Sequence, residues 1–319
     1  MTNHLTRILV VGAGFGGIAA ALTLARQRSP HPQIILVSQK PHFEYHAGLY
    51  RVVTGESPLE VCIPIRDIIA DLPIEFVSDT IVGIDLAGRT ATGSSGIRYA
   101  FGSLILGLGS QTSYFDIPGL ERFSFGFKSI TEALRLKRHL HQLFEACGAG
   151  ATADQRVCLL HLVVVGAGAS GVELAGELAV YARRLANRYG VDPGAITLDL
   201  VEAAPRILPA LPERFAARVA ARLRALGVNL FVNRAMVREE CEQLIVRGMS
   251  MKTDTVIWTA GVKPNELYGK IPGLPLDARG RVLVDAYLQV HGMKGIFVIG
   301  DGAATPYAGM AQTAIATGL

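Results

Sequence analysis

The chain has 319 residues, and half of them are hydrophobic, which is enough to fill the cores of two domains. Its formal net charge is only +4, and it has no basic stripe interleaved with aromatic residues, so the sequence does not predict nucleic-acid binding. The four cysteines are too far apart for a CxxC or CxxxxC pair, so we expect reduced thiols without a redox role and no metal site.

The first predicted element is an apolar strand from Arg7 to Val11 that leads into a glycine-rich turn. Gly12, Gly14 and Gly17 have the GxGxxG spacing, and a helical stretch follows through Ala25. A strand, such a turn and a helix are typical of a dinucleotide-binding unit. The first two glycines let the backbone approach a pyrophosphate, and the third lets the helix pack on the strand.

A second apolar run, residues 34–37, ends at Ser38 and Gln39. The acid that usually binds a ribose at this place is absent, and Ser38 or Gln39 can form a weaker hydrogen bond to a ribose hydroxyl. Segments 80–86 and 97–99, with a Gly/Ser turn between them, predict a small β-meander. The unit closes with a strand that ends at Gly109.

A helix is predicted to begin near Ser129, because Ser129 and Glu132 have the spacing of a capping box. The leucines that follow give this helix an apolar side. Residues 148–151, Gly-Ala-Gly-Ala, predict a linker into the rest of the chain.

The plan of the first unit then recurs. An apolar run, residues 159–165, leads into a second GxGxxG turn and a helix. This turn begins 154 residues after the first, and the closing strand at Gly261 comes 152 residues after the one at Gly109. Two landmarks with nearly equal offsets predict an α/β fold with two Rossmann-like dinucleotide-binding domains. The glycines of the second turn are Gly166, Gly168 and Gly171.

In the second unit a strand over residues 196–201 ends at Glu202. A carboxylate there accepts hydrogen bonds from a ribose 2′-hydroxyl and repels a 2′-phosphate, which favours NADH over NADPH. Glu202 lies farther from its loop than the usual ~20 residues, and the polar segment 181–194 predicts an extended helix end and a loop. Segments 228–232 and 243–247 predict a second meander.

The order of these motifs resembles the flavin-dependent pyridine-nucleotide oxidoreductases, and among them the type II NADH dehydrogenases, which are NADH:quinone oxidoreductases. The resemblance covers the whole chain and includes residues 50–55, 257–262, 295–301 and 311–314. It implies FAD at the first loop, NADH at the second, and Gly300 and Asp301 as a second contact to FAD. Gly109 and Gly261 complete the predicted cofactor-binding residues. It also implies an FAD-binding domain, residues 1–115 and 277–319, around an NAD(H)-binding domain, residues 116–276.

The resemblance implies that hydride passes from NADH to the flavin and electrons then pass to a quinone, without a protein nucleophile. It places Glu173 near the nicotinamide and flavin, although a carboxylate in the first turn of a helix is equally explained by the helix dipole. Gln312 is expected to hydrogen-bond the flavin edge or the quinone, with a polar helix cap as the alternative. Ala316 replaces a second glutamine of the family, and residues 46–50 lack the usual Pro-Leu-Leu, so the acceptor is less defined than the donor.

Three functions stay open at this point. The first is an NADH:quinone oxidoreductase, the second a soluble reductase of a ferredoxin or rubredoxin, and the third a non-enzymatic NADH-sensing flavoprotein. The N-terminus carries no signal-peptide pattern, so we expect a cytoplasmic protein at the inner face of the cell membrane. The family pattern continues beyond Leu319, so we expect a C-terminal region that completes the quinone site and contacts the membrane. A homodimer is compatible with the sequence, which does not determine the assembly.

Overall fold

The computed structural model describes residues 7–27, 32–306 and 310–319, and the chain divides into two compact units. Unit 1 consists of Met1–Glu44, Cys62–Gln111 and Val262–Leu319, and unit 2 of Tyr45–Val61 and Thr112–Gly261. These units place residues 45–61 with the middle of the chain and residues 262–276 with its ends. The assignment of cofactor-binding domains to residues 1–115, 116–276 and 277–319 stays a prediction.

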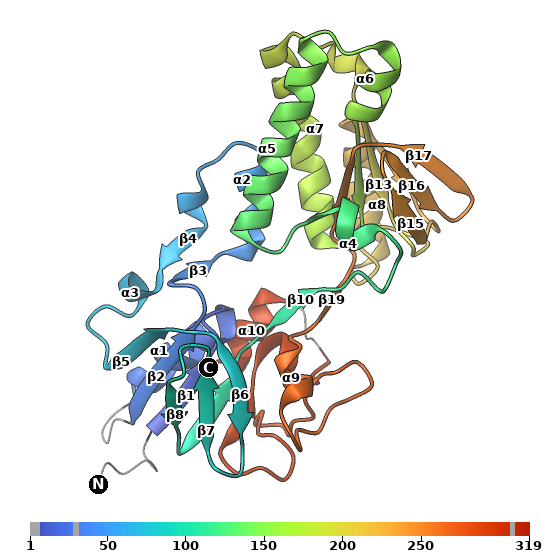
Figure 1. Ribbon diagram of the computed structural model, residues 1–319. Helices are drawn as coiled ribbons and strands as arrows, with labels where there is room; N and C mark the ends of the chain where they lie inside the picture. Colours follow the sequence, from blue (N-terminus) through green and yellow to red (C-terminus); the bar gives the residue numbers. More distant parts are fainter. Residues whose placement is uncertain (1–6, 28–31, 307–309) are drawn as a thin grey trace. The chain divides into compact units, whose positions relative to one another are not determined.

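Unit 1 is built on a five-stranded parallel sheet with the order β20-β9-β1-β2-β5. Strands β1 and β2 have continuous apolar runs, as expected for strands buried on both faces. Figure 1 shows how the N-terminal and C-terminal parts of the chain join in this unit, where β20 pairs with β9 and helix α10 contacts helix α1. The bounds are β1 (Arg7–Val11), α1 (Phe15–Ala25), β2 (Gln33–Ser38), β5 (Ile74–Ser78), β9 (Ser103–Leu106), β20 (Ile296–Val298) and α10 (Ala311–Thr317).

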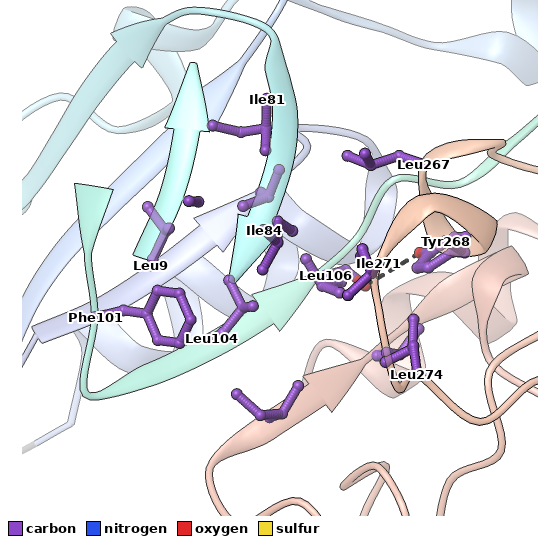
Figure 2. Close-up of a cluster of buried hydrophobic side chains, with 14 of the residues drawn as sticks. Leu9, Ile81, Ile84, Phe101, Leu104, Leu106, Leu267, Tyr268, Ile271 and Leu274 are labelled. Carbon is purple, nitrogen blue, oxygen red and sulfur yellow. Dashed lines mark hydrogen bonds between the residues drawn. The ribbon is translucent and has the colours of Figure 1, made fainter. Parts of the chain in front are cut away.

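A three-stranded antiparallel meander of β6 (Ile81–Asp85), β7 (Thr90–Gly93) and β8 (Arg98–Ala100) belongs to the same unit. The predicted first meander is therefore confirmed. Figure 2 shows the core that it shares with the parallel sheet and with helix α9 (Leu267–Lys270). The labelled side chains of this core are Leu9, Ile81, Ile84, Phe101, Leu104, Leu106, Leu267, Tyr268, Ile271 and Leu274.

Tyr268 is one of the two tyrosines of this core. Its side chain is 1% exposed, and its hydroxyl donates to the Leu106 carbonyl at 3.4 Å and accepts the Leu108 N–H at 3.3 Å. Burial raises the pKa of Tyr268, so the phenol stays protonated. A side chain at Gly302 would overlap the Tyr268 hydroxyl. Tyr268 thus supports both the end of β9 and the turn after β20.

Unit 2 contains a second five-stranded parallel sheet with the order β11-β18-β12-β13-β14. Helix α7 connects β12 to β13, and helix α8 connects β13 to β14, which is the βαβ plan of unit 1 repeated. The predicted α/β fold with two Rossmann-like sheets is confirmed. The bounds are β11 (Phe125–Gly126), β12 (His161–Val165), α7 (Ala169–Tyr189), β13 (Thr197–Val201), α8 (Glu213–Ala225), β14 (Val228–Phe231) and β18 (Thr255–Trp258).

The second meander lies later in the chain than the sequence predicts. It consists of β15 (Met236–Glu240), β16 (Gln243–Val246) and β17 (Met249–Lys252). The assignment of residues 228–232 to a meander is wrong, because β14 pairs in parallel with β13. Helix α8 precedes β14 and is the crossover that this parallel pairing requires; Phe215, Val219 and Leu223 mark it in the sequence at four-residue spacing, and the meander assignment overlooked it.

Helix α5 (Ile130–Gly148) begins where the capping pattern predicts. The Ser129 hydroxyl accepts the Glu132 N–H at 3.2 Å, and the Glu132 carboxylate accepts the Lys128 N–H at 2.7 Å. The helix continues through Gly148, so the expected linker is partly helical, and α6 (Ala153–Leu159) follows. The other short helices and strands are β3 (His42–Glu44), α2 (Leu49–Val53), β4 (Cys62–Pro64), α3 (Ile65–Ile68), β10 (Ser110–Thr112), α4 (Leu120–Phe123) and β19 (Val262–Pro264).

Among the described residues, none of the helices combines the length and the apolar character of a membrane-spanning segment.

One carboxylate lies in the core of unit 2. Glu239 on β15 is 5% exposed and stands opposite Leu244 of β16, which is fully buried. Residues opposite each other on antiparallel strands share a face, so Glu239 points to the same apolar side. Its Oε2 has no hydrogen-bond partner among the described residues. Burial therefore raises the pKa of Glu239 to about 8.

We expect Glu239→Gln to stabilise unit 2 at alkaline pH. The folded-state pKa lies above the value of an exposed glutamate, so Glu239 lowers the free energy of unfolding progressively as the pH rises between these two values. Glutamine cannot ionise. We expect the substitution to raise the free energy of unfolding by on the order of 2 kcal/mol at pH 8.5 and by little near pH 4.5. Urea unfolding followed by Trp258, the only tryptophan and a member of the same core, measures it.

The control is Glu240→Gln, which changes the exposed neighbouring carboxylate that pairs with Arg238. A buried, protonated Glu239 would be contradicted if Glu239→Gln raised the free energy of unfolding equally at both pH values. It would also be contradicted if Glu240→Gln raised it as much as Glu239→Gln does.

Candidate dinucleotide-binding sites

The three glycines of the first loop have different structural roles. Gly12 has φ +100°, and a Cβ there would overlap the Gly107 carbonyl. A Cβ at Gly17 would overlap the Gly12 carbonyl, so both positions require glycine for the fold itself. At Gly14, in contrast, a Cβ would meet nothing within 4 Å. The loop therefore presents its middle glycine to open space.

The second loop repeats this division. Gly166 has φ +105°, and a Cβ there would lie 2.6 Å from the Ala260 backbone. A Cβ at Gly171 would overlap the Gly166 carbonyl, whereas one at Gly168 would meet nothing within 4 Å. Each loop therefore exposes a short segment of backbone that no side chain covers. This segment lies at the start of a helix, where main-chain N–H groups point outward. Such a surface accommodates a pyrophosphate, and a side chain there would obstruct it.

In unit 1 the predicted FAD residues gather at one edge of the parallel sheet. The Gly12 loop follows β1, Ser38 ends β2 and Gln39 follows it, and Gly109 follows β9. Since all these strands run parallel, their carboxyl ends meet at the same edge, where α/β sheets bind their ligands. Gly109 has φ +66°, and a Cβ there would meet nothing within 4 Å.

Asp301 lies at this edge too, in a short turn directly after β20. The Ser110 hydroxyl donates a hydrogen bond to the Asp301 carboxylate. Gly300 has φ +66°, and its N–H donates to the Thr317 hydroxyl at 3.1 Å, which ties the turn to α10. Ser110 and Tyr268 are supporting residues that the sequence did not indicate, because each lies far along the chain from the turn it holds.

In unit 2 the Gly166 loop and Glu202 share the carboxyl edge of the second sheet. Glu202 follows β13 and is half-buried, and its carboxylate accepts backbone N–H groups from Ala167 and Ala204 at 2.7 and 2.8 Å. The Thr259 hydroxyl, another feature that the sequence did not indicate, lies 2.9 Å from the carbonyls of Val165 and of Gly166 and donates to them.

Packing alone requires a glycine at position 261. A Cβ there would lie 2.6 Å from the Ser113 carbonyl and equally close to the Phe115 ring. Its assignment to the cofactor site therefore stays a prediction.

The two predicted catalytic side chains lie in different units. Gln312 is exposed on α10 of unit 1, and Glu173 is exposed on α7 of unit 2. Desolvation by nearby protein atoms raises the pKa of Glu173. The expected position of Glu173 in a first helical turn is wrong, because α7 begins at Ala169 and Glu173 is its fifth residue. The helix dipole thus explains this carboxylate less well, since the effect falls off after the first turn.

The four cysteines are unpaired. Cys147 and Cys158 are buried, Cys241 is exposed, and Cys62 is half-buried on β4. Burial raises the pKa of the Cys62, Cys147 and Cys158 thiols, so these three are thiols and not thiolates at neutral pH. Within the described ranges, no three His, Cys, Asp or Glu residues come together in a way that could hold a metal ion.

Comparison with known proteins agrees with this architecture. The chain is 32% identical to the type II NADH:quinone oxidoreductase Ndh of Mycobacterium tuberculosis, over 97% of this chain and 70% of that one. It is 28% identical to a type II NADH:quinone oxidoreductase of Staphylococcus saprophyticus, over 94% and 75% of the two chains.

Two solved structures share the fold at low sequence identity. NDH2 of Plasmodium falciparum, solved in complex with NADH, has a TM-score of 0.85 at 19% identity, with 93% of this chain and 64% of that chain covered. A ferredoxin reductase of Rhodopseudomonas palustris has a TM-score of 0.80 at 22% identity, with 98% and 74% covered. The chain thus spans less than two thirds of the Plasmodium protein.

The model of the family described as pyridine nucleotide-disulphide oxidoreductase matches residues 6–318. That match takes in both glycine loops, both parallel sheets and the turn at Asp301. The chain therefore belongs to the pyridine nucleotide-disulphide oxidoreductase family.

Proposed function

We propose that the chain is an FAD-dependent NADH dehydrogenase that delivers electrons to a quinone. The observation that carries this proposal is the pair of glycine loops, one in each unit, with the same three structural roles in both. Two loops of this kind fit two dinucleotides in one chain. Curated relatives that match over 94–97% of the chain bear the name type II NADH:quinone oxidoreductase, which supports this pair of substrates.

FAD fits unit 1 and NADH fits unit 2. In unit 1 the bare backbone at Gly14 accommodates a pyrophosphate, and Asp301 offers a carboxylate to the hydroxyls of the remaining part of the cofactor. In unit 2 Gly168 has the corresponding role, and Glu202 offers acceptors to a ribose. Bound FAD supplies the redox chemistry, because its ring system accepts a hydride and returns electrons to an acceptor. The protein contributes binding and orientation.

The fold is compatible with more than one electron acceptor, since a ferredoxin reductase has nearly the same architecture. The names of the curated relatives favour a quinone over a ferredoxin or rubredoxin. We propose Glu173 and Gln312 as the side chains nearest the chemistry. Peripheral association with the inner face of the cell membrane, where quinones are dissolved, belongs to the same proposal, as does a homodimer.

The decisive experiment is an anaerobic titration of the protein with NADH, followed by a panel of acceptors. We expect NADH to bleach the flavin absorbance and a short-chain quinone to restore it over many turnovers. Bleaching without turnover on any acceptor would instead indicate a sensor, and turnover only with a ferredoxin or rubredoxin would indicate the soluble reductase.

We expect Gly14→Val to lower the FAD content of the purified protein at least about tenfold, and Gly168→Val to leave FAD in place but prevent bleaching by NADH. Both side chains would enter open space, so both variants should fold. The ratio of flavin to protein absorbance and the NADH titration measure the two effects. Gly83→Val is the control, because a Cβ at this strand residue also meets open space. Full FAD occupancy in Gly14→Val would show that unit 1 is not the FAD site.

The cysteines are expected to be spectators of the reaction. Cys62→Ser combined with Cys241→Ser removes the two accessible thiols, and adding Cys147→Ala and Cys158→Ala removes the buried ones. We expect the NADH oxidation rate to stay within about twofold in the double variant, since burial keeps the Cys62 thiol protonated and no two cysteines have the spacing of a redox pair. A loss of turnover while FAD stays bound would point to a thiol-based reaction.

A further inference from the structure

Ala167, between the first two glycines of the second loop, has both of its backbone polar groups bonded to the segment that follows β13. Its N–H donates to Glu202 Oε2 at 2.7 Å, and its carbonyl accepts the Leu208 N–H at 2.8 Å. The other oxygen of Glu202, Oε1, accepts the Ala204 N–H at 2.8 Å. The Glu202 carboxylate therefore bridges the glycine loop and residues 203–209, which we call the bracing segment.

The bracing segment is itself held firmly. Ile207 and Leu208 are 3% and 5% exposed. The Arg206 guanidinium donates to the carbonyls of Leu208 and Pro209 at 2.9 and 2.7 Å. Leu208 has φ +47°, a conformation that a leucine keeps only where its surroundings fix it. Glu202 thus joins the loop to a rigid neighbour.

Both contacts of Glu202 are charge-assisted hydrogen bonds to main-chain N–H groups, the stronger class of such bonds. Without the carboxylate, the N–H groups of Ala167 and Ala204 would both lose their acceptor. In unit 1 the position that corresponds to Glu202 is Ser38. The Gly12 N–H donates to the carbonyl of Val37, the residue before Ser38, just as the Gly166 N–H donates to the carbonyl of Val201, the residue before Glu202. A serine has one side-chain oxygen and cannot bridge two N–H groups with two acceptors.

We propose that Glu202 is a positioning residue for the nucleotide phosphates: it fixes the glycine loop before the nucleotide binds, in addition to any contact with the ribose. This inference rests on the proposed NADH site. Its consequence is that Glu202 supports the binding of ligands that have no ribose hydroxyl to offer. An arginine near the ribose is what usually binds the 2′-phosphate of NADPH. Because the Arg206 guanidinium already donates to two backbone carbonyls, removal of Glu202 alone creates no NADPH site.

The test compares two probes on FAD-loaded protein, ADP and 2′,3′-dideoxy-ADP, by calorimetry. The dideoxy probe keeps the pyrophosphate but cannot donate a hydrogen bond from its ribose. We expect Glu202→Ala to weaken dideoxy-ADP about tenfold, because that loss comes from the loop, and to weaken ADP by at least the same factor, because any ribose contact is lost as well. In the ligand-free protein, amide hydrogen exchange at Ala167 should become at least about tenfold faster.

Glu213→Ala, at an exposed carboxylate on α8 of the same unit, is the matched control and should leave both quantities unchanged. Glu202→Gln is the milder variant if alanine unfolds the unit. It keeps one acceptor oxygen and should weaken dideoxy-ADP as well, by a smaller factor.

If Glu202→Ala or Glu202→Gln weakens ADP but leaves dideoxy-ADP unchanged, Glu202 is a ribose ligand only and the inference is overturned. Unchanged exchange at Ala167 would overturn it as well. A wild-type protein that binds neither probe would instead refute the proposed nucleotide site, while exchange at Ala167 would still decide whether Glu202 fixes the loop.

Discussion

The structure of both units depends on one close backbone contact. The chain must leave a central strand, turn within a few residues and enter a helix that packs over the same strand. In each unit this is achieved because the third glycine of the loop touches the carbonyl of the first, with no room for a side chain. The first glycine also donates its N–H to the end of the neighbouring strand, to Val37 or Val201, at 2.8 Å in both units. This contact fixes where each helix begins and leaves the middle glycine bare.

The same geometry is combined with different chemistry in the two units. Unit 1 has Ser38 at the end of its second strand and adds Asp301 from the C-terminal part of the chain, held by Ser110. Unit 2 has Glu202, whose carboxylate is bonded to its own loop. Parallel strands bring these residues to one edge of each sheet, although they are distant in sequence. Two units with similar folds can thus hold two different dinucleotides.

The sequence predicts what depends on short stretches of chain. Glycine spacing is such a feature, because the contact of the third glycine with the carbonyl of the first is made within six residues. The start of α5 is another, since Ser129 caps the helix through Glu132 three residues later. Glu202 could be located because it ends an apolar strand. The site residues themselves stay predictions, since the structure shows where they lie and not what they bind.

Features that depend on distant residues were not predictable. Tyr268 supports the backbone at Leu108 from 160 positions away, and no local pattern distinguishes it from any other tyrosine. Glu239 stands in a strand where a charged residue ordinarily marks the exposed face, yet it lies in the core. β14 was misassigned because the helix before it, which makes the crossover to parallel pairing, was overlooked.

We expect one chain to hold two dinucleotides at two separate loops. Calorimetric titration of FAD-loaded protein with ADP-ribose, together with measurement of the flavin that remains bound, tests it most directly. ADP-ribose should bind at one site per chain while all of the FAD stays in place. Release of FAD in proportion to the ADP-ribose bound, or no binding at all, would contradict it.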